Sequence, residues 1–421
     1  MALILFGVFL VLLAAGVPVA FSICTASAVT MFAGYGDQKM MIIVQRMFQS
    51  CDSFSLIAVP FFILAGDLLA KGKISKVLVE FCESFLGFIR GGLSVVSVLA
   101  GMFFAAISGS GAATTAAVGA TLVPELKKRG YREDSAAALV AAAGTIGVVI
   151  PPSVPMVLYA VIAEESVNRL FKAGFIPGIL MGAILIAISL FQAYKWGYPK
   201  GTKFDLKNIG KTFVKAVPAI LMPLIILGGI FSGYFTPSEA AAVAVVYAVL
   251  VSKFVYRDLT WKELFNIMKG SARTSAVIMI IIACSGPFGW ALANWRIPEA
   301  ISSSVLAVST NKYIIMLLIS FIILIAGVFM ETSSAIIILT PVFLPLVTAL
   351  NVSTLHFGIL FVVGIAIGMI TPPVAINLFV ATGITGLPIE KISKSVVPYL
   401  IGLIAVFLLI VFVPLFIPGL L

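Results

Sequence analysis

The chain has little charge and almost none of the residues that enzyme active sites commonly use. Only 10% of its 421 residues are charged, and 61% are hydrophobic, whereas a soluble domain has roughly 25% charged residues. So few charges cannot cover the water-exposed surface of a soluble fold of this length, so we expect lipid to be its main solvent. The one histidine, His356, lies in a predicted loop, which leaves a serine hydrolase without a base.

Cysteine pairs and phosphate-binding loops are also missing. The four cysteines lie at 24, 51, 82 and 284 without paired spacing, so we expect apolar packing residues and neither a disulfide framework nor a metal site. No glycine-rich loop ends in Lys-Ser or Lys-Thr, which disfavours ATP-driven transport. The net charge of +10 is explained by basic cytoplasmic loops and not by nucleic-acid binding. We therefore expect no enzyme activity and no organic cofactor.

Apolar runs that suit membrane-spanning helices recur from end to end. Examples are 2–20, 176–190, 216–231, 240–251, 313–329 and 396–414. The first run lacks a basic leader and reads as a span, not as a signal peptide. We predict an all-α polytopic membrane protein with roughly 10–12 transmembrane helices plus two re-entrant helical hairpins.

Two sequence landmarks recur at one offset. The sequence GVVIPP at 147–152 returns as GMITPP at 368–373, and LVPEL at 122–126 matches FLPLV at 343–347. The two offsets, 368 − 147 and 343 − 122, are equal. Duplicated halves with interrupted apolar segments at matching places are typical of secondary transporters. We predict a first repeat at 1–194, a basic cytoplasmic linker at 195–215 and a second repeat at 216–421.

Charge predicts that the two halves are inverted. The loop after the first LVPEL landmark contains four basic residues, Lys127, Lys128, Arg129 and Arg132. Its counterpart at 348–355 contains no Lys or Arg. Because basic loops stay on the cytoplasmic side, equivalent loops are expected on opposite sides of the membrane.

Each half contains two segments that interrupt an apolar helix. The run SGSGAATT at 108–115 has the mate FMETSS at 329–334, which predicts re-entrant hairpins near 100–125 and 320–346. The two Pro-Pro sequences predict broken helices near 140–162 and 360–382, since proline removes an N–H and clashes with the preceding turn. Taken singly, the first run is also compatible with close helix packing and Pro-Pro with a kink. Recurrence at one offset favours functional breaks.

Broken helices expose groups that bind ions. Freed carbonyls and hydroxyls are hard ligands that suit Na⁺, and helix N-termini favour anions, so two cation sites flanking one anion site are expected. Glu331 is the only acid between 299 and 390 and is a candidate functional residue or a solvated hairpin tip. Asn377 either faces substrate or forms a helix–helix hydrogen bond. Asp67 has no acidic mate in the second half, and His356 is expected to be solvated.

The chain resembles the large membrane subunit of tripartite ATP-independent periplasmic (TRAP) transporters. The resembling stretches are VPFFILAG at 59–66, ISGS at 107–110, GVVIPP at 147–152, FTPSEAAA at 235–242 and GMITPP at 368–373. The resemblance implies an elevator-type carrier in the bacterial inner membrane that takes up a small organic acid, of the sialic acid or C4-dicarboxylate class, with a sodium gradient. It also implies a separate small four-helix membrane subunit and a periplasmic substrate-binding protein.

Carried over to matching positions, the resemblance implies two or more transported Na⁺ ions. The first sodium site would use Ser108, Gly147, Ile150 and Pro152. The second would use Gly327, Glu331, Thr332, Gly368 and Thr371. Substrate would lie near Ser110, Thr114, Ser333 and Asn377.

Three other functions are weighed against this one. A stand-alone inverted-repeat carrier of dicarboxylates or inorganic ions is the alternative, and it would need no binding protein. A channel would need a filter sequence, and none repeats here. An intramembrane hydrolase using Ser108 or Ser110 lacks a histidine base.

Overall fold

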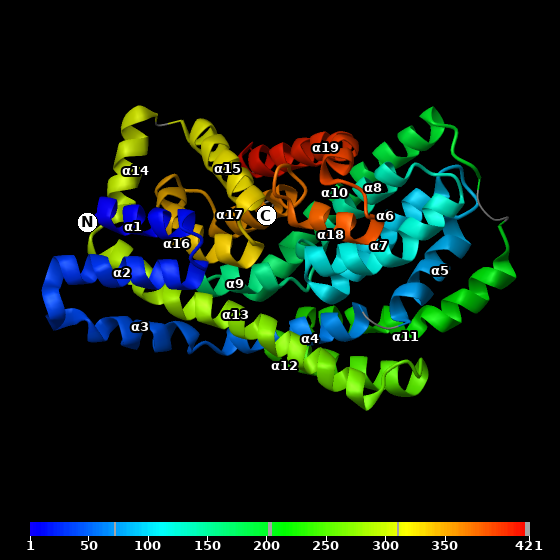
Figure 1. Ribbon diagram of the computed structural model, residues 1–421, viewed down its shortest axis with the longest axis horizontal. Helices are drawn as coiled ribbons and strands as arrows, with labels where there is room; N and C mark the ends of the chain where they lie inside the picture. The colour runs from blue at the N-terminus through cyan, green and yellow to red at the C-terminus, as the bar shows by residue number, and fades with distance from the viewer. Residues whose placement is uncertain (71–72, 201–203, 310, 417–421) are drawn as a thin grey trace.

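The protein is built almost wholly of helices. The computed structural model describes residues 1–70, 73–200, 204–309 and 311–416 (Figure 1). Residues 201–203 of the predicted linker lie outside the described residues. Within the described ranges, the only β-type pairing is a single bridge between Arg90 and Lys200.

The helices fall into two series along the chain. The first contains α1 (Ala2–Ala14), α2 (Val19–Tyr35), α3 (Met41–Cys51), α4 (Ala58–Ala70), α5 (Ile74–Leu86), α6 (Gly92–Ser108), α7 (Gly111–Lys128), α8 (Glu133–Thr145), α9 (Val154–Ile162) and α10 (Val167–Lys195), with 3₁₀ helices η1 (Gly36–Lys39), η2 (Phe54–Ile57) and η3 (Ile146–Val148). The second contains α11 (Leu206–Phe231), α12 (Pro237–Leu250), the π-helix η4 (Val251–Val255), α13 (Trp261–Asn294), α14 (Ile297–Val308), α15 (Lys312–Phe329), α16 (Thr332–Ala349), α17 (Thr354–Gly368), α18 (Ile376–Thr385) and α19 (Ile389–Phe416).

The predicted all-α membrane fold is confirmed. In the described part of the chain, eight helices are long and apolar enough to cross a bilayer, and the bent pair α3–α4 adds a ninth if it is one span. The shorter apolar helices include α1, α6, α17 and α18, so the estimate of roughly 10–12 spans is reached only when short segments are counted.

The first apolar run is not one helix. α1 ends at Ala14, and Gly16 adopts a left-handed φ of +80° before α2 begins at Val19. Gly16 and Val17 donate their N–H groups to the carbonyls of Leu13 and Leu12. Glycine in this conformation ends helices at little steric cost, so the segment 2–20 forms one helix, a turn and the start of the next.

The helix order repeats along the chain. The offset from the start of α7 to that of α16 (332 − 111) equals the offset from the start of α8 to that of α17 (354 − 133). The packing is also reciprocal, because α7 packs against α18 while α16 packs against α9; Figure 1 shows α7 beside α18. Both features support two related units that exchange contacts at a shared centre. The limits of the repeats and their opposite orientation stay predictions.

One pair of equivalent segments differs in shape. α3 and the helix that begins at η2 meet at an angle of 64°, whereas α13 runs unbroken for 34 residues. On α3, Met41, Val44 and Phe48 are exposed and Ile43 is buried, which suits a helix that lies against lipid. Residues 261–268 form the first turns of α13.

His356 is buried, so the expectation of a solvated loop residue is wrong. It is the third residue of α17, is 2% exposed, and its Nε2 lies 2.8 Å from the carbonyl oxygen of Ile410 on α19. Because α17 begins at Thr354, the imidazole lies inside the helix bundle and not in the preceding loop.

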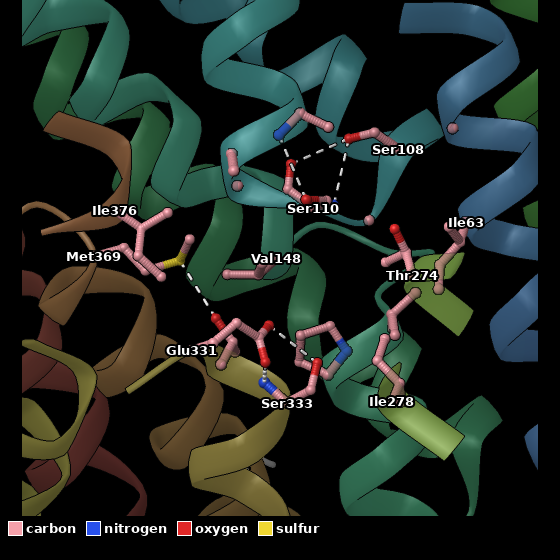
Figure 2. Close-up of a pocket in the computed structure, with 18 of the residues that line it drawn as sticks. Ile63, Ser108, Ser110, Val148, Thr274, Ile278, Glu331, Ser333, Met369 and Ile376 are labelled. Atoms are coloured by element: carbon pink, nitrogen blue, oxygen red, sulfur yellow. Dashed lines mark hydrogen bonds between the residues drawn. The ribbon is translucent and has the colours of Figure 1, made fainter. Parts of the chain in front are cut away.

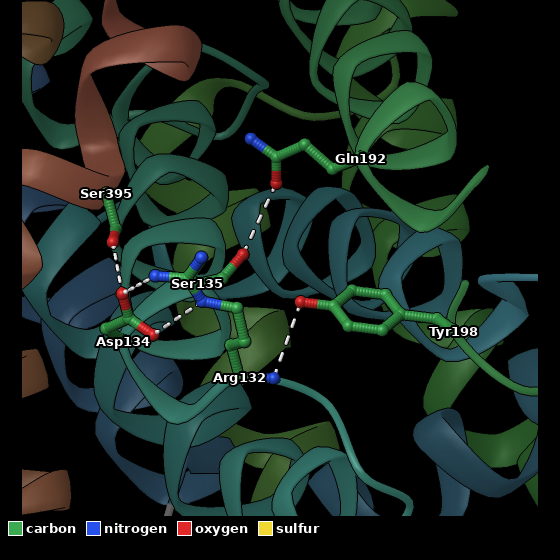
Figure 3. Close-up of polar contacts among 6 residues, drawn as sticks. All are labelled: Arg132, Asp134, Ser135, Gln192, Tyr198 and Ser395. Atoms are coloured by element: carbon green, nitrogen blue, oxygen red, sulfur yellow. Dashed lines mark hydrogen bonds and ion pairs between the residues drawn. The ribbon is translucent and has the colours of Figure 1, made fainter. Parts of the chain in front are cut away.

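A polar network holds the start of α8 against α10 and α19 (Figure 3). Asp134 accepts hydrogen bonds from Arg132 (2.8 Å) and from the hydroxyl of Ser395 on α19 (2.6 Å). The neighbouring Ser135 donates to Gln192 on α10. α8 leads directly into the first Pro-Pro break, so this network fixes the helix whose end forms the candidate site.

Two glycines bring α15 and α17 into main-chain contact. A Cβ added at Gly368 would lie 2.5 Å from Cα of Gly327. We predict that Gly368→Ala destabilises the fold by about 1–3 kcal/mol, because a packed interface has no room for a methyl group. The thermal unfolding midpoint of the purified protein in detergent measures this. Gly383→Ala on α18, where a Cβ meets nothing within 4 Å, is the control, and equal midpoints for the two variants would contradict the prediction.

Candidate functional site

A cavity of about 250 Å³ lies between two hairpin tips. The first tip is the turn between α6 and α7, and the second tip is the turn between α15 and α16. Figure 2 shows Ser108 and Ser110 on one side of it, and Glu331 and Ser333 facing them from the other. The remaining walls come from α4, from α13 and from the two broken helices. The first broken helix consists of α8, η3 and α9, and the second consists of α17 and α18. These walls include Val148, Val154, Met369, Ile376, Ile63, Gly66, Asp67, Thr274 and Ile278. The structure thus brings together segments from both halves of the chain.

The first tip is a cluster of neutral oxygens. Ser108 and Thr114 share a hydrogen bond of 2.9 Å between their hydroxyls, and Ser108 Oγ donates to the carbonyl of Ser110. Gly109 turns the chain with a φ of +60°, and the Ser110 hydroxyl caps α7 by accepting from the N–H of Ala113. Ser108 and Thr114 are 3% and 0% exposed, so these oxygens are shielded from bulk water.

The first broken helix lies directly against this cluster. A Cβ added at Gly147 would lie 2.5 Å from Thr114 Oγ1 and 2.7 Å from the carbonyl oxygen of Ser110. A Cβ at Gly109 would lie 2.8 Å from the carbonyl oxygen of Pro152. Three of the four residues predicted for the first sodium site, Ser108, Gly147 and Pro152, are therefore close together. The fourth, Ile150, packs its side chain against Gly178 of α10, so it has only its main chain to offer.

The second tip differs because a carboxylate caps its helix. Glu331 accepts hydrogen bonds from the N–H groups of Ser333 (2.9 Å) and Ser334 (3.2 Å), and from the Ser333 hydroxyl (3.1 Å). The positive end of α16 is thereby neutralised by the protein's own anion. Of the two tips, the N-terminus of α7, which a neutral serine caps, is the one that can attract an external anion.

Only two of the five residues predicted for the second sodium site line the cavity. Glu331 and Thr332 line the cavity, and the Thr332 hydroxyl points to the sulfur of Met369 at 3.4 Å. Gly327, Gly368 and Thr371 are not in its wall. Gly327 and Gly368 are packed together, and Thr371 donates its hydroxyl to the carbonyl of Ile367 and its N–H to that of Gly368.

Two of the four predicted substrate residues also line the cavity, and two do not. Ser110 and Ser333 line the cavity, whereas Thr114 and Asn377 are buried behind its wall. Asn377 Nδ2 donates to the carbonyl of Ala141 at 3.2 Å, which is the helix–helix bond weighed as one of its two roles. Its Oδ1 has no hydrogen-bond partner in the described part of the chain.

Two lining residues were missing from the predicted set. Asp67 on α4 accepts a 2.6 Å hydrogen bond from Ser271 on α13, and Thr274 lies one turn further along α13. An acid inside an apolar run is a functional hypothesis by default, so Asp67 carried a usable signal. Thr274 carried none, because hydroxyl residues at helical spacing are common in membrane helices.

This arrangement suits binding more than bond-breaking chemistry. Among the described residues, the cavity wall contains no histidine or cysteine, and its ionisable groups are the carboxylates Asp67 and Glu331. A volume of about 250 Å³ suits a small ligand. Hydroxyls, carbonyls and one open helix N-terminus offer ligands for cations and for one small anion.

The chain matches one protein family along nearly its whole length. Residues 6–416 match the model of the family described as "Tripartite ATP-independent periplasmic transporter, DctM component". The chain is 42% identical to the Isethionate TRAP transporter permease protein DctMQ of Oleidesulfovibrio alaskensis, over 98% of this chain and 65% of that protein. It therefore spans slightly less than two thirds of that relative.

Two further comparisons agree with this match. The chain is 39% identical to the C4-dicarboxylate TRAP transporter large permease protein DctM of Pseudomonas aeruginosa, over 88% of this chain and 86% of that protein. The crystal structure of the Alcanivorax borkumensis YdaH transporter superposes with a TM-score of 0.66 at 13% identity, over 91% of this chain and 90% of that one. The latter similarity concerns the fold alone.

Gly109 allows a test of the contact between the first tip and the first break. We predict that Gly109→Ala lowers both the unfolding midpoint and uptake, since it adds about 1–2 kcal/mol of left-handed strain and places a methyl group against Pro152. Gly130→Ala has a similar φ of +80° but open space around it, so strain alone is expected there and uptake should be retained. Uptake into cells and thermal unfolding distinguish the two, and identical behaviour would refute the contact.

Proposed function

Because the chain belongs to the tripartite ATP-independent periplasmic transporter family as its DctM component, we propose that it takes up a small organic acid with co-transported sodium ions. It is a multi-pass protein of the inner membrane, and its relatives are named as permeases and not as enzymes. The large component of a tripartite system works with a small membrane component and a periplasmic one.

The oxygen cluster at the first tip is the observation that carries the sodium proposal. The hydroxyls of Ser108 and Thr114 and the carbonyl of Ser110 converge beside the main chain of Gly147 and Pro152. Hard oxygen ligands without a carboxylate suit a monovalent hard cation. A site of this kind holds Na⁺ without the strong field that would retain a divalent ion.

A second ion is proposed at the equivalent place in the other half. Gly327, Gly368 and Thr371 lie where the second hairpin meets the second break, with Thr332 and Glu331 at the nearby tip. Main-chain oxygens, the hydroxyls of Thr371 and Thr332 and the carboxylate of Glu331 are available there. We therefore propose two or more Na⁺ ions per cycle as transported cargo, with no organic cofactor.

The charge of the cavity supports coupling between sodium and substrate. Asp67 and Glu331 give its wall two carboxylates, which repel an organic anion when no cation is bound. Bound sodium ions offset that repulsion, and the N-terminus of α7 at Ser110 then offers N–H groups to a carboxylate. Sodium and substrate are thus each expected to bind more tightly when the other is already bound.

The substrate class follows the relatives. Isethionate and C4-dicarboxylates, which name two relatives, are small organic anions, and we extend that class to this chain. Sialic acid, the other candidate from the sequence, belongs to it too. Ser110 and Ser333, on opposite sides of the cavity, are the proposed substrate contacts, with Thr114 and Asn377 buried behind them.

An elevator movement is proposed from the composition of the cavity wall. Hairpin tips and broken helices form part of the wall, and α4 and α13 form the rest. If the first group moves past the second, the tips carry ions and substrate across the bilayer together. We propose that a separate four-helix membrane subunit supports the α4–α13 side and that a periplasmic binding protein delivers substrate.

Sodium dependence tests the ion sites. Ser108→Ala and Thr371→Ala should each raise the sodium concentration for half-maximal uptake about three- to tenfold, as expected for one lost hydroxyl ligand. The control is Ser97→Ala, whose buried hydroxyl on the same helix as Ser108 donates to the carbonyl of Leu93 away from the cavity. An unchanged sodium response in both site variants would count against these sites.

Reconstitution tests the tripartite mechanism against a stand-alone carrier. In proteoliposomes with the small subunit, uptake should require both an inward sodium gradient and the substrate-loaded binding protein. Omitting either should reduce uptake to background, measured with a radiolabelled C4-dicarboxylate, isethionate and sialic acid in turn. Full uptake without the binding protein would favour the stand-alone carrier.

A further inference from the structure

A second cavity, separate from the hairpin tips, lies where the turn between α12 and α13 meets the end of α4. Its volume is about 390 Å³, and its polar wall consists of Ser252, Asp258, Glu263 and Asn266. Leu68 of α4 contributes to the apolar part of the wall. The cavity is next to a basic stretch that contains Lys253, Arg257, Lys262 and Lys269, and basic stretches favour the cytoplasmic side of a membrane.

Two oxygens in this wall lack a hydrogen-bond partner. Ser252 is 1% exposed, and its Oγ has no partner among the residues that the structure describes. Asp258 Oδ1 is also buried and has no hydrogen-bond partner among the described residues. The other oxygen of Asp258 accepts a hydrogen bond from the main-chain N–H of Lys73, at the start of α5. Buried polar atoms are nearly always hydrogen-bonded, so two orphan oxygens in one cavity point to a missing donor or cation.

A second acidic residue, Glu263, also lines this cavity and is exposed. Glu263 caps α13, and its Oε2 accepts both the N–H and the hydroxyl of Thr260. Its other oxygen is not used by the cap. The amide of Asn266, further along α13, also lines the cavity. Every polar group in the wall can therefore act as an oxygen ligand.

Two ammonium groups near this turn are bound elsewhere. Lys73 Nζ donates to the carbonyl of Tyr256, and Lys253 Nζ donates to that of Leu259. No ion pair within the described ranges involves Asp258 or Glu263. In the part of the chain that the structure describes, the two carboxylates thus share a cavity without an ion-paired countercharge.

We propose that this cavity binds a hydrated divalent cation of the Mg²⁺ type, held by Asp258 and Glu263 with Ser252 and Asn266 as further ligands. Carboxylate, hydroxyl and amide oxygens are the ligands that such ions prefer. Mg²⁺ dehydrates reluctantly and keeps several waters, which suits a cavity larger than a bare ion. The ion would join the α12–α13 turn to α13 and, through Asp258, to the start of α5.

Manganese provides a direct probe, because Mn²⁺ replaces Mg²⁺ in oxygen sites and is visible by electron paramagnetic resonance. The full chain in detergent should bind one equivalent of Mn²⁺, displaced by Mg²⁺ and not by Na⁺ at equal ionic strength. Asp258→Asn and Glu263→Gln should each weaken binding at least about tenfold. Both changes are nearly isosteric, and glutamine can still complete the helix cap.

The chain offers a matched control for Glu263. Glu239 caps α12 in the same way, with Thr236 as its partner, but it does not line the cavity. Glu239→Gln should therefore leave Mn²⁺ affinity unchanged. The proposal is overturned if the wild type shows no saturable binding, if the three variants bind equally, or if binding is lost only in Asp67→Asn or Glu331→Gln, which would place the ion at the hairpin tips.

Discussion

A helix that breaks inside a bilayer leaves N–H and carbonyl groups that lipid cannot satisfy. In this protein each break is covered by a hairpin tip. Gly109 packs closely against the carbonyl of Pro152, and Gly327 packs against Gly368. These contacts have room for no side chain, so the two tips and the two breaks form one closely packed unit around the cavity. Main-chain oxygens and hydroxyls such as that of Ser108 are the ligands that we propose for the transported ions.

The two tips are related in position but differ in chemistry. Ser110 caps the first with a neutral hydroxyl, and Glu331 caps the second with a carboxylate. The break segments differ as well, since residues 151–153 are buried while Pro373 and Val374 are exposed. The two tips are thus chemically asymmetric: one helix N-terminus is open to an anion, and the other carries a charge that favours cations.

The part of the cavity wall formed by α4 and α13 contributes a further carboxylate. Asp67 is fixed by Ser271 across the α4–α13 contact, so this charge belongs to the side that the elevator proposal treats as stationary. Glu331 belongs to the side proposed to move. Their separation would change during such a movement, and with it the electrostatic cost of holding an anion in the cavity. The strength of coupling between sodium and substrate would then depend on the position of the tips.

The sequence by itself determined the class of protein, the repeated landmarks and the places where helices break. Those features follow from composition and local pattern: too few charges for a water-exposed surface, and Pro-Pro or Gly-Ser runs that disrupt a helix wherever they occur. Tertiary structure decided which of the predicted residues meet. It placed Ser110 and Thr114 beside Gly147, gave Asn377 a helix–helix bond, buried His356 and brought Asp67 into the cavity. These outcomes depend on how helices far apart in the sequence pack together, and neither spacing nor hydrophobic pattern along the chain encodes that packing.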